Sequence, residues 1–318
     1  MANIIPPTGQ FIVPADEHES RIDRALIRQV GAEQRTLIMR LIRKGNIRIN
    51  GKRCKPNDHV KTGDSIFIPM SLRQSAPTDE HDATISPHQL RQVENIPILF
   101  EDDWLLVLDK PAGMVVHGGS GHDAGLIEAL KEARNLPELR LAHRLDRDTS
   151  GVLLLAKSLE ALRQLTESFR ERDMDKTYLA WISGHPEPHA ARMTSHLSKG
   201  VTMGGERMVV HDVDGKLSIT DYQVVLQAAS THTDYALVAL KPHSGRTHQL
   251  RVQLQQEGHA ILGDPKYASK EELAAFKGLG GKGLMLHAWR LRLLHPITQQ
   301  LLCFTASLPQ RLTRFYRT

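Results

Sequence analysis

The sequence predicts an α+β protein, with a small N-terminal unit and a larger body that holds a mixed, mainly antiparallel β-sheet with flanking helices. Three observations lead to this prediction. Apolar residues recur at helical spacing before residue 45, and a polar segment without periodicity covers residues 73–89. Alternating strand patterns follow without a regular strand–helix–strand order. A chain of 318 residues is long enough for two domains of unequal size.

The composition is moderately basic. Lys and Arg total 41 against 36 Asp and Glu, and the pI of about 9.2 is compatible with a polyanionic partner if the cations cluster. Cys54 and Cys303 lie far apart, which predicts neither a disulfide framework nor a thiolate zinc site. No apolar run approaches the ~20 residues of a membrane span, and prolines interrupt the N-terminal segment where a signal peptide needs an apolar core. We therefore expect a cytoplasmic protein without membrane contact.

The first 72 residues carry the patterns of two helices and a small sheet. Apolar spacing predicts helices around residues 22–30 and 37–41, and Gly45 ends the second. The pair Asn50-Gly51 suits a type I′ turn between the strands IRIN and KRCK. The segment TGDSIFI adds a further turn and strand.

Basic residues are dense in this unit. Between Arg21 and Lys55 only Asp23 and Glu33 oppose them. A charged helix is most often a solvated face, but a cluster this one-sided favours phosphate contacts. The segment RTLIMRLIRKGNIRINGKR also resembles the S4 type of RNA-binding domain over residues 20–70, which implies a structured RNA. The candidate RNA contacts in this unit are Arg40, Arg43, Lys44, Arg48, Lys52 and Arg53.

The body begins with the apolar runs PILF and WLLVLDK, which predict paired strands before a turn at Lys110-Pro111-Ala112-Gly113. The following HGGSG lacks the G-K-[ST] ending of a phosphate loop, so nucleotide hydrolysis is not predicted. Next come a helix at GLIEALKEA, a buried strand at GVLLLAK, a helix from the cap Ser158 to Glu171, and a strand at KTYLAWISG.

The rest of the body alternates well enough for an antiparallel sheet. ITDYQVVLQ and YALVALKP read as paired strands, and a turn at Gly245 and Arg246 leads into a helix that Gly258 ends. LMLHAWRLRLLHP and LLCFTA supply the last strands. We expect a tail over 1–19, the S4-like domain over 20–72, a linker over 73–92 and the body over 93–318.

The segment HRLDRDTSG, residues 143–151, holds the most informative acid of the body. Alternating charges are most often a solvated turn. A buried strand follows this segment directly, so we expect Asp146 on a loop that enters the core.

Five motifs in this order, HRLDRDTSG, KTYLA, SGRTHQLRV, ILGDPKY and LHAWRL, resemble those of RNA pseudouridine synthases of the ribosomal large-subunit type, over residues 93–310. Gln253, Ala260 and Ala268 depart from the usual family residues. The resemblance implies an isomerase that turns uridine into pseudouridine in large-subunit (23S) ribosomal RNA, with no cofactor.

The resemblance also implies residue roles. Asp146 becomes the catalytic carboxylate, and Arg246 lies against it to orient and charge-stabilise it. From its spacing alone, Arg246 would be a structural arginine in a turn. Tyr178 stacks on the target uracil, and its hydroxyl is a candidate proton acceptor. Arg144 either takes the place of the extruded base or contacts a phosphate.

Other polar residues receive structural roles. Asp148 points away from Asp146 if the loop is extended, and Asp264 and His287 act as structural support. The scattered histidines lack companion ligands, so we expect no metal site. We expect a monomer.

Three alternatives stay open. A nucleosidase or glycosidase needs a second carboxylate opposite the first, and no partner for Asp146 is evident. An RNA-binding protein with an inactive synthase-like body would not require an intact Asp146, Tyr178 and Arg246. A pseudouridine synthase could also act on another structured RNA.

Overall fold

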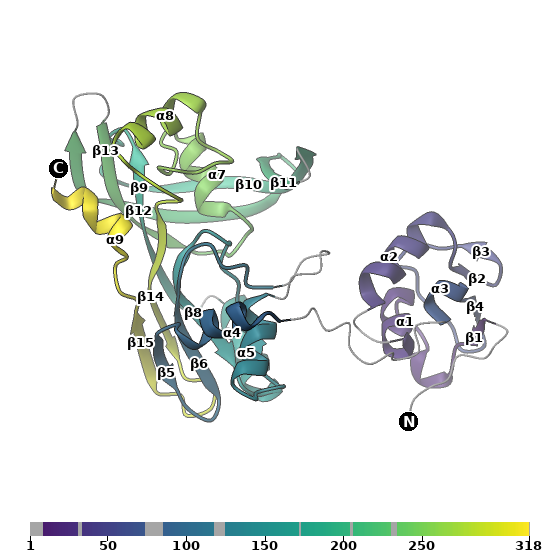
Figure 1. Cartoon of the computed structure of the whole chain (residues 1–318). Helices are drawn as coiled ribbons and strands as arrows, with labels where there is room; N and C mark the ends of the chain where they lie inside the picture. The colour runs from purple at the N-terminus through teal and green to yellow at the C-terminus, as the bar shows by residue number, and fades with distance from the viewer. Residues whose placement is uncertain are drawn as a thin grey trace. The chain divides into compact units, whose positions relative to one another are not determined.

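The computed structural model describes residues 9–30, 34–73, 85–117, 125–171, 173–203, 206–229 and 234–317. The chain separates into two compact units, Met1–Asp82 and Ala83–Thr318, which are described one at a time (Figure 1). The predicted HGGSG loop falls largely outside the described residues, as does most of the segment between residues 73 and 85.

The first unit packs helices on a small sheet with strand order β1-β4-β2-β3. At the β2–β3 turn Asn50 and Gly51 both have positive φ, 48° and 77°, and Ile49 pairs with Lys52. The predicted two-residue hairpin is therefore confirmed. Its elements are β1 (Gln10–Ile12), η1 (Ala15–Glu17), α1 (Ile22–Val30), α2 (Arg35–Lys44), β2 (Arg48–Ile49), β3 (Lys52–Arg53), β4 (Ser65–Phe67) and α3 (Met70–Arg73).

Both predicted helices of this unit are present. Ile22 and Leu26 of α1 and Ile38 and Ile42 of α2 are buried in one core, because their spacing places them on the inner helix faces. Gly45 ends α2 in the left-handed conformation (φ 74°). The prediction of a plain tail over residues 1–19 is wrong at β1, which pairs antiparallel with β4.

The second unit is built on one large sheet with the order β11-β10-β12-β13-β9-β14-β8-β6-β5, in which β15 also pairs with β14 and β7 with β8. Most pairs are antiparallel and β8–β14 is parallel, so the predicted mixed sheet is confirmed. The strands are β5 (Ile98–Glu101), β6 (Leu105–Lys110), β7 (Arg140–Leu141), β8 (Ser150–Ala156), β9 (Asp175–Ser183), β10 (Ala190–Met203), β11 (Glu206–His211), β12 (Lys216–Ala229), β13 (Asp234–Pro242), β14 (Leu286–Leu294) and β15 (Leu301–Thr305).

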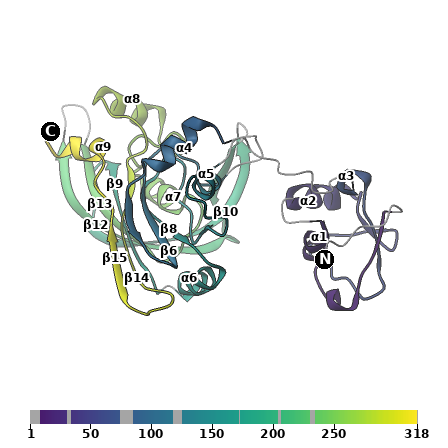
Figure 2. The same ribbon diagram turned by 60° about the horizontal axis from the view of Figure 1, so that its bottom comes forward.

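Helices cover both faces of the sheet. Leu106 of β6 and Leu153 of β8 pack with α4 and α5, whereas their neighbours Val107 and Leu154 pack with α6 on the opposite face. Figure 2 shows β6 and β8 between α5 and α6. The helices are α4 (Pro87–Glu94), α5 (Leu126–Ala133), α6 (Leu159–Glu171), α7 (Gln249–Gln256), α8 (Lys270–Gly278), α9 (Gln310–Thr313) and the 3₁₀ helix η3 (Arg314–Arg317).

Several elements differ from the prediction. The helix α4 begins inside the predicted linker, where Ser86 and Gln89 form a capping box and Val93 is buried. The prediction that residues 73–89 lack regular structure is therefore wrong at both ends, because α3 ends at Arg73 and α4 starts at Pro87. The strands β10 and β11 and the helix α8 were not predicted.

The parallel pair β8–β14 brings two distant segments very close. Gly151 has a φ of 111°, and a Cβ at this position would lie 2.1 Å from the backbone oxygen of Ala288 in β14. Only glycine fits such an approach without a backbone shift. This crossing places the loop before β8 beside β14 and β9 at the centre of the sheet.

Candidate active site

Three segments meet around Asp146 in a cavity of about 100 Å³. The loop before β8 supplies Asp146, β9 supplies Tyr178, and the turn into α7 closes the third side. The neighbouring order β9-β14-β8 explains why the first two meet. A wider groove of about 760 Å³ adjoins the cavity and shares Arg144, Asp146, Lys176, Tyr178, Gly245 and Arg246 with it.

The Asp146 carboxylate is held by Arg251 of α7. The Nη1 of Arg251 donates to Oδ2 of Asp146 at 3.1 Å, while its Nε and Nη2 donate to the fully buried carboxylate of Asp264, both at 2.7 Å. Burial alone would lower the pKa of Arg251, but the bonds and charges of Asp264 and Asp146 outweigh it and raise that pKa. Arg251 is thus a fixed cation against Asp146.

This geometry corrects the prediction for Arg246. That residue lines the cavity, but its side chain is exposed and makes no ion pair or hydrogen bond to Asp146 in the described part of the chain. Arg246 lies in the turn before α7, whereas Arg251 lies inside the helix on a buried face. The ion pair with Asp146 that the prediction assigned to Arg246 is made by Arg251.

Lys110 donates a hydrogen bond to the loop that carries Asp146. Its ammonium is fully buried and donates to the backbone oxygens of Pro111, Met114 and Arg147 at 2.9, 3.1 and 3.0 Å. Gly113 N–H also donates to Arg147 O. Burial lowers the pKa of Lys110 to about 8. Lys110 therefore links the turn after β6 to the Asp146 loop through hydrogen bonds. The sequence did not predict this role.

Buried amides fix α7 to the sheet. Gln249 Nε2 donates to Ile219 O and Thr220 Oγ1, and its Oε1 accepts from Ser244 Oγ and from the Arg246 N–H. Gln253, one turn later, accepts from Thr220 Oγ1 at 2.7 Å. These bonds set the rotation of α7 that aims Arg251 at Asp146.

Tyr178 lies on the cavity wall, where Asp146 is also found. Burial, together with the Asp146 charge, raises the pKa of Tyr178 well above its usual range. Its phenol therefore stays protonated at neutral pH, which suits stacking and hydrogen-bond donation better than the predicted proton acceptance.

The remaining body residues of the prediction occupy distinct places. Arg144 is exposed at the cavity and groove. Asp148 is about half exposed and lines neither space. The loop turns at Asp146, whose carbonyl accepts from Thr149 N–H, so it is not extended. His287 is buried and bonded to Ser150 Oγ at 2.8 Å, away from the cavity.

The six predicted RNA contacts of the first unit are all exposed. Arg28 and Arg21 nearby are paired with Glu17 and Asp23. In contrast, no described carboxylate lies within 4.0 Å of the six: Arg40, Arg43, Lys44, Arg48, Lys52 and Arg53.

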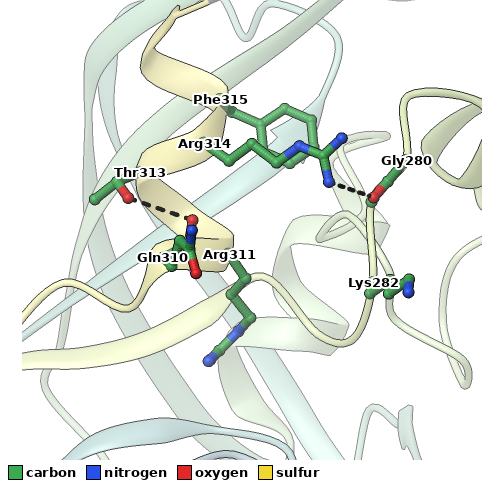
Figure 3. Close-up of a pocket in the computed structure, with 8 residues that line it drawn as sticks. Gly280, Lys282, Gln310, Arg311, Thr313, Arg314 and Phe315 are labelled. Carbon is green, nitrogen blue, oxygen red and sulfur yellow. Dashed lines mark hydrogen bonds between the residues drawn. The ribbon is translucent and has the colours of Figure 1, made fainter.

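A second hollow lies apart from the Asp146 cavity. This hollow of about 740 Å³ lies between the loop at Gly280 and the C-terminal helix, where Arg314 donates to Gly280 O (Figure 3). None of the described residues that line it carries a carboxylate, so it does not resemble the Asp146 cavity. Within the described ranges no cluster of three or more metal-ligating side chains occurs, and no helix is long and apolar enough to cross a bilayer.

Comparison with known proteins agrees with this architecture. Residues 104–256 match the RNA pseudouridylate synthase family model, and residues 20–66 match the S4 domain. The chain is 40% identical to ribosomal large subunit pseudouridine synthase C of Escherichia coli (strain K12) over 97% of this chain and 96% of that protein. The enzyme of the same name from Haemophilus influenzae is also 40% identical, over 94% and 91%.

Solved structures show the same fold. The human protein named RNA pseudouridylate synthase domain containing 4 aligns with a TM-score of 0.57 at 29% identity, over 72% of this chain and 94% of that one. Human RNA pseudouridylate synthase domain containing 1 aligns with a TM-score of 0.56 at 26% identity, over 71% and 94%.

Proposed function

Since this chain belongs to the RNA pseudouridylate synthase family, we propose that it isomerises specific uridines of large-subunit (23S) ribosomal RNA, with Asp146 as its catalytic carboxylate. The protein is a pseudouridine synthase with an S4 domain. The ribosomal target is supported by relatives whose names specify the large ribosomal subunit and which match nearly the whole chain. We further propose a cytoplasmic monomer that needs neither metal nor nucleotide.

The reaction rearranges atoms without adding any. The N1–C1′ bond breaks, the uracil turns in place, C5 bonds to C1′, and the proton lost from C5 is balanced by one gained at N1. A carboxylate serves this by attacking the sugar or by easing proton removal from it. Asp146 suits both roles, because Arg251 holds its Oδ2 with a fixed positive charge in a partly buried cavity.

The observation that carries this proposal is the linked set of Asp264, Arg251 and Asp146. The bidentate bond to Asp264 leaves Arg251 one nitrogen, Nη1, for Asp146. Asp264 is fully buried behind Arg251, so it does not serve as the second carboxylate of a glycosidase.

Substrate contacts follow from the cavity wall. Tyr178 stacks on the target uracil as a neutral phenol. The uridine must leave its stack to reach Asp146, and the exposed Arg144 at the cavity mouth fills the vacated place in the RNA. Arg246, also exposed there, contacts the RNA backbone beside the target.

The first unit supplies affinity for structured RNA. Arg35, Arg40, Arg43 and Lys44 line a hollow of about 460 Å³ along α2, and the side chain of Arg53 lies over Gly45 at the end of that helix. Cations without carboxylate partners are free to neutralise phosphates. Arg48, which pairs with Arg53, extends this basic face onto the hairpin, whereas the exposed Lys52 pairs with Ile49.

Asp146→Asn tests the assignment, because the amide is isosteric but cannot act as nucleophile or base. Release of tritium from RNA that carries 5-tritiated uridine measures loss of the C5 proton. We expect no release with this variant, unchanged RNA affinity, and near-normal release with the matched control Asp148→Asn. Normal turnover by Asp146→Asn would refute the catalytic assignment.

Mapping pseudouridines in cells that lack the protein tests the target. Missing modifications in large-subunit ribosomal RNA would support it. Losses confined to another RNA would support the alternative substrate, and RNA binding without any turnover by the unmodified protein would support an inactive synthase-like body.

A further inference from the structure

His248 has a strained backbone next to the catalytic carboxylate. Its φ of 53° and ψ of 17° lie in the left-handed region, which is uncommon for residues other than glycine. Its side chain is 10% exposed, and its Nε2 lies 3.8 Å from Oδ2 of Asp146. The unusual conformation at the start of α7 therefore directs this imidazole toward Asp146.

A neighbouring tyrosine contacts one of the two imidazole nitrogens. Tyr267 Oη accepts from the Val209 N–H at 3.1 Å and lies 2.7 Å from Nδ1 of His248. In the described part of the chain the hydroxyl proton of Tyr267 has no other acceptor than this Nδ1. This arrangement favours Nδ1 as the acceptor, with the imidazole proton on Nε2, which faces Asp146.

The surroundings keep His248 neutral. Burial lowers the pKa of its imidazole. The carboxylates of Asp146 and Asp264 face the ring, and the cations of Arg251 and Lys266 oppose them, so charges of both signs surround it. His248 therefore offers Asp146 a neutral N–H donor beside the full charge of Arg251.

We propose that His248 is a positioning residue for Asp146, with Tyr267 as the partner that fixes its tautomer. On uridine binding, the Nε2–H closes on Oδ2, which Arg251 already holds, and Oδ1 is left for the ribose. The present 3.8 Å is longer than a hydrogen bond, and catalytic hydrogen bonds often tighten only when substrate binds. This inference rests on the proposed role of Asp146.

A pair of substitutions separates the donor from the backbone. His248→Asn keeps a residue that tolerates the left-handed conformation, but its amide is too short to reach Asp146. His248→Gln places an amide N–H near the position of Nε2. A hydrogen bond to a charged group is worth about 1.5 to 3 kcal/mol, so we expect His248→Asn to lower kcat roughly 10- to 150-fold with little change in KM.

His248→Gln should recover most of the kcat that His248→Asn loses. In His248→Asn the acid limb of the pH–rate profile should move to higher pH, because the ionised carboxylate of Asp146 loses a hydrogen-bond donor. Neither effect is expected of a residue that only supports the fold. Equal activity of His248→Asn and the unmodified protein would overturn the inference, as would equal losses in both variants.

Tyr267→Phe tests the tautomer. The phenyl ring keeps its contact with Arg251, whose guanidinium lies 5.1 Å from the ring centre, but the acceptor for Val209 and the donor to His248 are lost. We expect a kcat loss in the unmodified background and none in the His248→Asn background. Independent, additive losses would contradict the pairing.

The outcomes remain distinct from those for the proposed function. Full turnover by Asp146→Asn would remove the basis of both proposals. An inactive Asp146→Asn beside a fully active His248→Asn would overturn the positioning role alone.

Discussion

Neutralising four cations of the first unit tests whether its basic face contacts RNA phosphates. The change replaces Arg40, Arg43, Lys44 and Arg48 with glutamine. These positions were chosen because all four side chains are exposed, and none has a described carboxylate within 4.0 Å. Arg48 is also held by its own bonds to Gly45 O and Gly51 O, so its guanidinium has a defined place.

The size of the effect follows from counterion release. Each lost phosphate contact flattens the slope of log K against log salt by about 0.7 to 0.9, so four contacts flatten it by about 2.8 to 3.6. Doubling the salt should therefore weaken binding by the unmodified protein about ten-fold more than binding by the variant. Arg21 and Arg28 are left out because Asp23 and Glu17 already neutralise them.

The assay is a titration of a structured large-subunit ribosomal RNA fragment at several salt concentrations. A control of equal charge change replaces Arg163, Lys270, Lys277 and Arg292, which are exposed in the second unit and line none of the spaces described above. Tritium release from a short saturating substrate should be unchanged in both variants, because the Asp146 cavity belongs to the second unit.

If the quadruple variant and the unmodified protein show the same slope of log K against log salt, the predicted phosphate contacts are refuted and the basic face is only solvated. An equal flattening in the control variant would also refute it, because the effect would then follow net charge rather than contact.

Two further predictions concern the second unit. Arg251→Lys should lower kcat about 30-fold or more, because one ammonium cannot bridge the carboxylates of Asp146 and Asp264. Arg246→Lys should lower kcat by a smaller factor. Equal losses of tritium release in the two variants would return the orienting role to Arg246. Burial lowers the pKa of Lys110 from 10.5 to about 8, so between these two pH values the unfolded chain binds more protons than the folded one. In this pH range the free energy of unfolding should therefore rise with pH, by up to about 1.4 kcal/mol per pH unit relative to Lys110→Met. Urea unfolding at pH 8 and 9.5 measures this difference, and parallel curves for the two proteins would contradict it.

The sequence predicted those parts of the fold that local patterns encode. The Asn50-Gly51 hairpin, the helix α6 with its Ser158 cap and the buried strand β8 follow from turn chemistry and apolar periodicity. The strands β10 and β11 were not predicted, because the sequence of β10 mixes polar and small residues without clear alternation.

The position of Asp146 on a loop next to the core was predicted, but its arginine partner was not. The helix α7 is buried from Gln249 to Leu254, so no amphipathic stripe shows which side chain faces the cavity. A signal was present: an arginine between buried leucines requires a charged partner, and Asp264 follows 13 residues later. Lys110 gave no such signal, because its acceptors are backbone oxygens that the fold brings together.

The parallel pairing of β8 with β14 has a consequence for the order in which the protein folds. Ser150 and His287, which bond across it, are 137 positions apart, so the sheet centre forms only through contacts of long sequence separation. Such contacts slow folding, because a long loop must close before they stabilise it. During synthesis the first unit has all of its own strands long before β14 leaves the ribosome. The nascent chain therefore acquires its S4 domain before the Asp146 cavity can assemble.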